Sequence, residues 1–373
     1  MTQRVSANHI VRVILAKLAI ATVFLLYLSE KDLSRLPLMV DQERYLFDIA
    51  AIQNDVGVLF SSDEVFSTPR TLYARFVGGI AWLVPFEQQP ITIAVYLNSL
   101  LTVAIAAQTV RIFAWFGGRN TDLLFYIIAL SPTLTIYSFF AIRDVFIVLI
   151  VVVFLANFIE RRYFRAAIAA VACLFLRPFQ SLLFLFWVAL FCVRWAVNRS
   201  NQKRFSVAVL TMFTFVSVAA VGVVFGPPAV ANYAAGGVEW VRLATNALGL
   251  EALTGAETGV RVSSRANMAA RIVMFDSVAI PILSALVFVR SAVDVARARS
   301  HPTDSVVFVA VLSFLSAVLI SYSYIAIQDG LAFRKILPLL PVMWIAVALY
   351  SERRRDRLST SERSDGKGQL VHA

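Results

Sequence analysis

Arginines and carboxylates that could carry chemistry stand at the edges of apolar stretches in this sequence. Arg143 and Asp144 form a basic and acidic pair between two apolar runs, and Arg177 precedes Pro178 inside another. The planar fork of donors on arginine fits phosphate oxygens, and a carboxylate can take a proton from an attacking hydroxyl. These residue types therefore indicate group transfer on a phosphate-linked substrate.

Other charged residues of the same two kinds precede or follow further apolar runs. The carboxylates that could act as a base are Asp41, Asp144 and Asp329. The cations that could bind a phosphate group are Arg44, Arg143, Arg177, Arg334 and Lys335. Arg271 and Asp276 begin a later apolar run and could pair with each other.

These candidates also have structural explanations. Arg143 could extend its side chain to a membrane interface, and Asp144 could cap the helix that follows it. Arg177 is harder to explain in this way, because it stands between two apolar segments that are each short for a membrane span. The chemical and the structural explanations both stay open at the level of sequence.

Metal-dependent and nucleotide-dependent chemistry is not indicated. Cys173 and Cys192 lie in apolar stretches, where cysteine behaves as a small hydrophobic residue. His9, His301 and His372 lie in the N-terminal segment, a short loop and the C-terminal tail. The sequence contains no Walker loop. We therefore expect no metal site and no cofactor.

The elements that must position the charged residues are membrane-spanning helices. Hydrophobic residues make up 59% of the 373 residues and charged residues 15%, whereas a soluble chain has about 45–50% and about 25%. The apolar residues form blocks separated by short charged stretches, which is typical of repeated spans. The sequence therefore predicts an all-α, polytopic integral membrane protein.

The apolar blocks predict about ten spans. Two short ones, about 166–176 and 179–194, meet at Arg177-Pro178, because proline disfavours helix at the residue before it. The N-terminal apolar run lacks a small-x-small cleavage pattern, so we interpret it as a retained span rather than a signal peptide. The other predicted spans are about 13–29, 91–110, 122–142, 145–160, 205–226, 272–290, 304–326 and 336–351.

The basic residues predict that both termini are cytoplasmic. With that orientation, 21 of the 34 Lys and Arg residues fall on the inner side, including Arg4, Arg12 and Lys17, as the positive-inside rule requires. The net charge of +11 is then explained by topology and anionic lipid, and not by a nucleic-acid partner.

The remaining segments complete one membrane domain, residues 1–351. Two larger extracytoplasmic loops, about 30–90 and 227–270, contain the longest stretches between spans. An aromatic stretch at 72–86 is short and interrupted by glycine, which favours an interfacial or re-entrant helix. The charged, serine-rich segment 352–373 is predicted to be a disordered cytoplasmic tail.

Four short motifs resemble bacterial polysaccharide polymerases of the Wzy and EpsG-like type, which are GT-C-like membrane glycosyltransferases. The segment 130–144, LSPTLTIYSFFAIRD, has their early proline and their basic and acidic pair at the outer end of a span. Leu176-Arg177-Pro178 is similar to their later Arg-Pro, and 333–341, FRKILPLLP, to their arginine before a proline-rich last span. Asp41 and Tyr45 are similar to their early Asp and Tyr.

The resemblance implies an enzyme of the bacterial inner membrane that joins repeat units of an exopolysaccharide, capsule or O-antigen. Its substrates would be oligosaccharides linked to undecaprenyl pyrophosphate, and its surroundings membrane lipids, a flippase and a chain-length co-polymerase. Arg143, Arg177 and Arg334 would bind the pyrophosphate, and Asp144 or Asp41 would be the base. Asp329 would orient an arginine or a sugar.

Two alternatives stay open beside this reading. One is a glycosyltransferase that uses a polyprenyl-monophosphate sugar. The other is a non-enzymatic transporter or assembly subunit for an envelope polysaccharide. No span has a row of carboxylates suited to a proton relay, which counts against a transporter.

Overall fold

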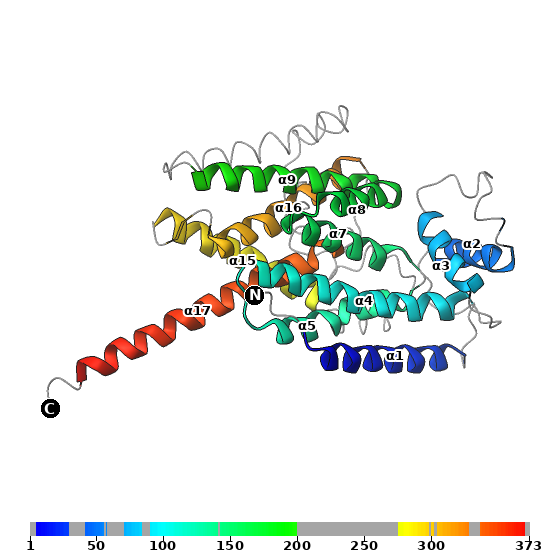
Figure 1. The fold of residues 1–373 in the computed structure, drawn as a ribbon, viewed down its shortest axis with the longest axis horizontal. Helices are drawn as coiled ribbons and strands as arrows, with labels where there is room; N and C mark the ends of the chain where they lie inside the picture. The colour runs from blue at the N-terminus through cyan, green and yellow to red at the C-terminus, as the bar shows by residue number, and fades with distance from the viewer. Residues whose placement is uncertain are drawn as a thin grey trace.

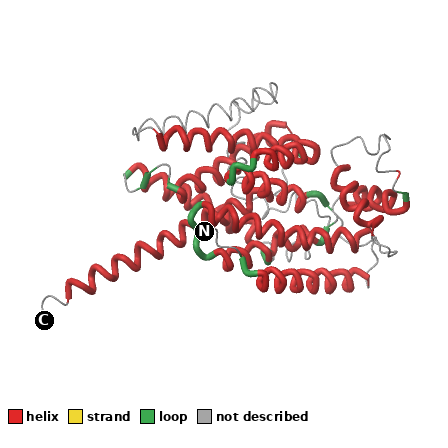
Figure 2. Tube along the Cα trace, viewed as in Figure 1, coloured by secondary structure: helices red, strands yellow, loops and turns green. Residues whose placement is uncertain are grey.

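The computed structural model describes residues 5–29, 42–55, 57, 71–83, 90–140, 142–199, 275–297, 300–301, 304–327 and 336–369. Within these ranges the regular elements are helices and there is no strand (Figure 2). Figure 1 shows α2 and α3 at one end of the long axis and α17 projecting from the other. The predicted all-α fold is confirmed for the described residues.

The helices follow the predicted apolar blocks. In the first half of the chain they are α1 (Ala7–Ser29), α2 (Gln42–Asn54), α3 (Thr71–Leu83), α4 (Pro90–Trp115), α5 (Thr121–Ala129), α6 (Pro132–Ser138), α7 (Asp144–Ile159), α8 (Tyr163–Leu176) and α9 (Pro178–Arg199). In the second half they are α15 (Asp276–Ala296), α16 (Ser305–Ile327), the short 3-10 helix η5 (Leu337–Leu339) and α17 (Leu340–Gln369).

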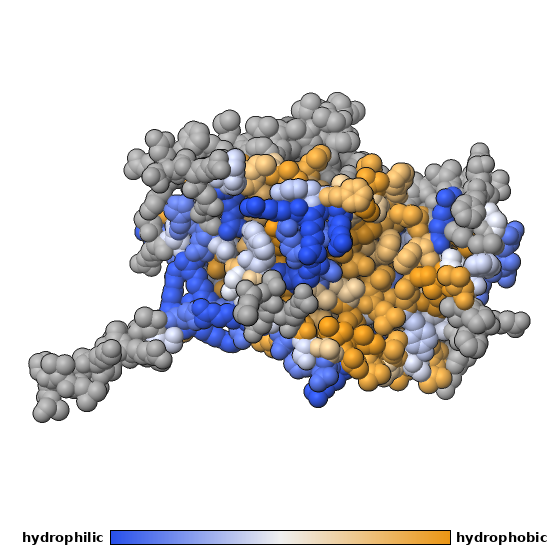
Figure 3. All heavy atoms as spheres, viewed as in Figure 1, coloured by the Kyte–Doolittle hydropathy of each residue, from blue (hydrophilic) through white to orange (hydrophobic). Residues whose placement is uncertain are grey.

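Three of the described helices, α1, α4 and α15, are long and apolar enough to cross a membrane. α5 and α6 meet the same criterion when they are taken together as one bent pair. Figure 3 shows a broad apolar area on one face, with hydrophilic residues on either side of it along the long axis. These features are compatible with a membrane protein. The ten spans and their sidedness stay predictions, and 205–226 and 227–270 lie outside the described residues.

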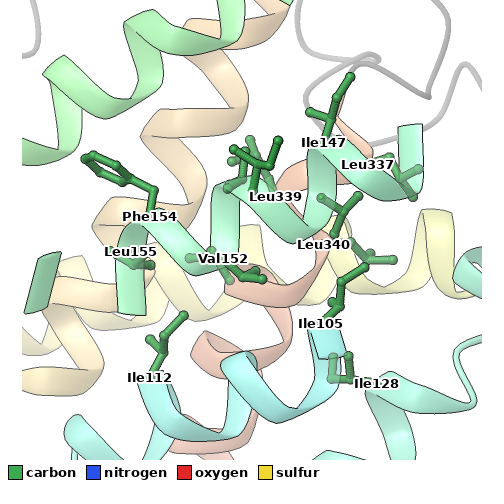
Figure 4. Packing of buried hydrophobic residues seen from close by; sticks show 14 of the residues in the cluster. Ile105, Ile112, Ile128, Ile147, Val152, Phe154, Leu155, Leu337, Leu339 and Leu340 are labelled. Carbon is green, nitrogen blue, oxygen red and sulfur yellow. The ribbon is translucent and has the colours of Figure 1, made fainter. Parts of the chain in front are cut away.

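Helix α7 lies at the centre of the apolar core. Its sequence is apolar on all faces, so every face must be covered by other elements. It packs against α4, α8 and η5. Figure 4 shows Ile147 and Val152 of α7 near Leu337, Leu340 and Ile105. The start of α7 is therefore held in place by packing along its whole length.

The single predicted span 122–142 is wrong as a continuous helix. It is divided into α5 and α6, which meet at an angle of 44°. Pro132 has no N–H to continue the ladder of α5, and Ser131 caps α6 by accepting a hydrogen bond from the Leu134 N–H at 3.3 Å. The proline therefore ends one helix and begins the next.

The predicted break at Arg177-Pro178 is confirmed. Arg177 ends α8 with extended backbone angles (φ −157°, ψ 88°), and Pro178 begins α9. The ring of Pro178 clashes with a helical conformation at Arg177, which accounts for the extended backbone. The break places the Arg177 side chain at the junction of α8 and α9.

Helices α2 and α3 form a closely packed pair beside α4. A Cβ atom at Gly78 would lie 2.8 Å from the Cβ atom of Ile52, so glycine is needed where the two helices meet. α3 has 13 residues, or about 20 Å at 1.5 Å per residue, which is shorter than a bilayer core of about 30 Å. The aromatic stretch at 72–86 thus contains a short helix, as expected.

Two findings go beyond the predictions. α17 continues to Gln369, into the segment 352–373. The charged turn that follows Tyr350 contacts the helical body, because Arg353 pairs with Asp304 at 3.0 Å. Lys17, which was assigned to the inner surface, is instead buried inside the molecule, where Nζ donates a hydrogen bond to Thr135 Oγ1.

Candidate functional site

A buried ion pair joins two of the residues that the sequence selects. Arg177 Nη2 donates a hydrogen bond to Asp144 Oδ1 at 2.7 Å. The two side chains are 5% and 4% exposed. Arg177 comes from the break between α8 and α9, and Asp144 is the first residue of α7. Residues 33 positions apart in the sequence are thus brought together at the ends of three helices.

Arg143 contacts the same junction. It occupies the N-cap position of α7, and its Nη1 donates a hydrogen bond to the carbonyl oxygen of Leu176. Its side chain is half-buried. The basic and acidic pair of the sequence therefore binds the helix break twice, through the Leu176 carbonyl group and through the Arg177 guanidinium group.

Backbone hydrogen bonds fix the position of Arg177. Its N–H donates to the Cys173 carbonyl oxygen at 2.7 Å, and its own carbonyl accepts from the Gln180 N–H at 3.0 Å. Gln180 is also buried, with an exposed fraction of 1%. These bonds fix the backbone from which the guanidinium group extends toward Asp144.

Tyr73 and Asn98 extend the buried polar site toward α3 and α4. The Tyr73 hydroxyl and the Asn98 side chain hydrogen-bond each other at 3.1–3.3 Å. Asn98 Nδ2 also donates to the carbonyl oxygen of Phe140 at 2.8 Å, three residues before Arg143. Asn98 thus connects α4 to the chain just before the ion pair.

Burial raises the pKa of the Tyr73 hydroxyl, and the hydrogen bond with Asn98 opposes this rise in part. Electrostatic interactions with the neighbouring Tyr45 and Asp144 raise the pKa of Tyr73 further. Tyr73 therefore stays protonated at neutral pH and can act as a hydrogen-bond donor close to Asp144.

Tyr45 and Asp48 bring α2 to the same site. The rings of Tyr45 and Tyr73 pack edge to face with their centroids 5.5 Å apart. Asp48 follows Tyr45 by three residues, which places both on one face of α2, and both are 1% exposed. A second buried carboxylate therefore lies on the helix that packs against Tyr73.

The structure describes three of the eight predicted site residues in full, namely Arg143, Asp144 and Arg177, and it brings these three together. The backbone of Arg44 belongs to α2, but its side chain is outside the described part. Asp41, Asp329, Arg334 and Lys335 also lie outside the described residues. Ile336, which follows Lys335, is buried, and the adjoining η5 packs against α7.

The sequence reasoning missed Asp48, Tyr73 and Asn98. Asp48 interrupts the apolar stretch 46–52, and Asn98 lies in the middle of the predicted span 91–110. Polar residues in such positions are uncommon unless they have a partner or a function, so both could have been selected. Tyr73 lies in an aromatic stretch of the sequence, so its residue type alone did not mark it as a candidate.

No known protein family, curated protein or solved structure matches the chain.

The arrangement itself limits what the site can do. Transferring two opposite charges out of water costs several kcal/mol per ion, and the attraction between them offsets this only in part. A buried pair is thus weak as a stabilising device, and its presence in an apolar region is better explained by binding or catalysis. Asp144 holds and orients Arg177, and the guanidinium group is suited to an anionic ligand.

Proposed function

We propose that the protein is a glycosyltransferase that polymerises oligosaccharide repeat units linked to undecaprenyl pyrophosphate. It acts at the outer face of a bacterial inner membrane, in exopolysaccharide, capsule or O-antigen synthesis. The observation that supports this most strongly is the buried Arg177–Asp144 pair at the meeting point of α7, α8 and α9. The motifs that resemble Wzy and EpsG-like polymerases contain these same residues.

The helix lengths support a site just below the outer surface. α7 has 16 residues and α8 has 14, so they are about 24 and 21 Å long, whereas a bilayer core is about 30 Å thick. In the proposed topology of about ten spans, with both termini inside, the ends that carry Asp144 and Arg177 lie on the outer side. The pyrophosphate of a lipid carrier would reach them from the headgroup layer.

The reaction transfers a growing chain from its carrier to a new repeat unit. An acceptor hydroxyl attacks the anomeric carbon of the donor, the bond from that carbon to the pyrophosphate oxygen breaks, and the electron pair leaves with the pyrophosphate. Arg177 and Arg143 stabilise the charge on the leaving group, together with Arg334, Lys335 and Arg44. The acceptor proton passes to a carboxylate, for which Asp144, Asp41 and Asp329 are the candidates.

Glycan length is the measurement that tests this function. A strain with the Arg143→Gln and Arg334→Gln substitutions together should make glycan shortened toward one repeat unit, with unchanged sugar composition. Polymer of normal length that lacks one sugar would favour the monophosphate-dependent transferase. Intact units trapped on the cytoplasmic leaflet would favour a transporter. Either result would overturn the proposal that the protein is a polymerase.

Reporter fusions test the topology. Fusions near Arg199 and after Tyr350 should be cytoplasmic, and a fusion near Gly255 should be external, because the inner loops hold the basic excess. A cytoplasmic reporter near Gly255 would contradict the ten-span arrangement. It would also separate the candidate residues between the two sides of the membrane.

A further inference from the structure

Lys17 is a buried lysine in the middle of the long apolar helix α1. Its exposed fraction is 1%, and Nζ donates a hydrogen bond to Thr135 Oγ1 of α6 at 2.6 Å. Within the described ranges Lys17 forms no ion pair with a carboxylate. A charged group in apolar surroundings is costly without a counter-charge, so a compensating anion is expected nearby.

Asp276, the first residue of α15, is a buried carboxylic side chain that binds the start of the same short helix, α6. It is 0% exposed. Its carboxylate accepts hydrogen bonds from Ser131 Oγ at 2.5 Å, from the Thr133 N–H at 3.1 Å and from Thr133 Oγ1. The described residues provide it with no cationic partner, and its expected pairing with Arg271 falls on a residue outside them.

The two charges lie on opposite sides of α6. Thr133 and Thr135 are two positions apart, which places their side chains on different faces of a helix. A helix with its side chains is about 10–12 Å across, so Lys17 and Asp276 are separated by about one helix diameter.

We propose that Lys17 and Asp276 are counter-charges that act across α6, and that together they position the turn that carries Arg143 and Asp144. Among the described residues neither side chain has a partner of opposite charge, and α6 binds both of them. The electrostatic part of this proposal stands on the geometry alone. The positioning part rests on the proposed function, because it concerns a turn of the candidate active site.

Hydrogen bonds connect α6 to the active-site turn. Ser138 Oγ lies 3.4 Å from Ser99 Oγ of α4, and the preceding residue of α4, Asn98, donates a hydrogen bond to the Phe140 carbonyl oxygen. Phe140 is two residues past the end of α6 and three before Arg143. A shift of α6 would therefore move the start of α7, and with it the contact between Asp144 and Arg177.

A double-mutant cycle on the purified protein tests the electrostatic coupling. We expect Lys17→Met and Asp276→Asn each to lower the apparent melting temperature in detergent by several degrees, because each leaves the other charge uncompensated. The apparent melting temperature of the double variant should fall by clearly less than the sum of the decreases in the two single variants. Additive losses would overturn the proposal.

Variants at Thr135 keep the test usable if a charge variant does not fold. Thr135→Ser retains the hydroxyl that binds Lys17, so its melting temperature should be close to that of the wild-type protein. Thr135→Val removes the hydroxyl and should have a lower melting temperature. Thr135→Val should also be coupled to Lys17→Met, since both remove the same contact. Equal melting of the two Thr135 variants would overturn the assigned role of Lys17.

Glycan length at matched membrane levels tests the positioning role. Lys17→Arg, which keeps the charge, should preserve length, whereas Lys17→Met should shorten the glycan and the double variant should recover part of it. Coupled melting with full glycan length in all variants would overturn the positioning role alone. If the strain with Arg143→Gln and Arg334→Gln also makes glycan of full length, the proposed function itself fails.

Discussion

Ion pairs at the two ends of the molecule differ in their exposure and in what surrounds them. At the junction of α7, α8 and α9 the Arg177–Asp144 pair is almost completely buried. Near the base of α17 the ion pairs are open to solvent, and in the Arg119–Asp356 pair the side chains are 76% and 61% exposed. Arg353–Asp304 is intermediate, with side chains 25% and 30% exposed.

Exposed and buried ion pairs need different explanations for their presence. An exposed pair contributes about 0–1 kcal/mol, because water solvates both partners whether or not they meet. In the proposed topology, arginines at the base of α17 can therefore be retained because basic residues favour the cytoplasmic side. A buried pair costs desolvation energy, so Arg177 and Asp144 need another reason to be there. The proposed reaction supplies that reason.

The largest effect is expected on stability when one member of the buried pair is removed. Arg177→Met leaves the Asp144 carboxylate uncompensated and should lower the free energy of unfolding by about 3–5 kcal/mol. Asp144→Leu combined with Arg177→Met should recover most of that loss, because no buried charge is left. Denaturation of the purified protein in detergent measures both. A double variant as unstable as the single one would show that the pair stabilises the fold.

The next effect is expected on activity. Arg177→Lys keeps the positive charge beside Asp144 but loses the planar fork that fits phosphate oxygens. If the fork acts on the leaving group, the loss is about 2–4 kcal/mol, or roughly 30- to 1000-fold in rate. Glycan length and the rate of polymerisation in membranes measure this loss.

Arg353→Lys is the matched control at the other end of the molecule. It makes the same chemical change in a pair of intermediate exposure away from the candidate site, so the rate and the glycan length should stay unchanged. Full glycan length in Arg177→Lys cells at a normal membrane level would assign Arg177 a structural role.

Much of the fold could be predicted from the sequence because apolar blocks and prolines are local signals. The break at Arg177-Pro178 follows from one proline and from the residue before it. The division between α5 and α6 rested on the same kind of signal at Pro132, but the continuous apolar stretch around it favoured a single span. Local rules thus locate helix ends more reliably where the flanking segments are short.

The candidate site was predictable only in part, because contacts between distant residues leave no local signal. Nothing in the spacing of Asp144 and Arg177 shows that they bind each other rather than two separate ligands. Lys17 was assigned to the inner surface by its position in the chain, yet the structure buries it against Thr135. Rules based on charge alone cannot distinguish a lysine at a helix end from one that finds a polar partner inside.

A smaller effect is expected for a pair of intermediate exposure. Arg111 binds Glu160 through two hydrogen bonds, of 3.1 and 2.5 Å, between side chains that are 35% and 23% exposed. The bidentate geometry is favourable, but solvent screens it, so Arg111→Gln should cost about 1 kcal/mol in unfolding free energy. Raising the salt concentration should reduce the difference between the two proteins. A decrease in unfolding free energy as large as that of Arg177→Met would show that buried and partly exposed ion pairs do not differ in this protein.

The smallest effect is expected for Arg119→Ala. The Arg119 guanidinium lies 3.5 Å from Asp356, and both side chains are mostly exposed, so the unfolding free energy should change by less than about 0.5 kcal/mol. The contact that ties this loop to α17 does not use the Arg119 side chain. Glu352 accepts hydrogen bonds from the backbone N–H groups of Arg119 and Asn120, at 3.0 and 2.8 Å. Glu352→Ala removes that contact and should therefore destabilise the protein more than Arg119→Ala, and the reverse order would show that the exposed ion pair matters after all.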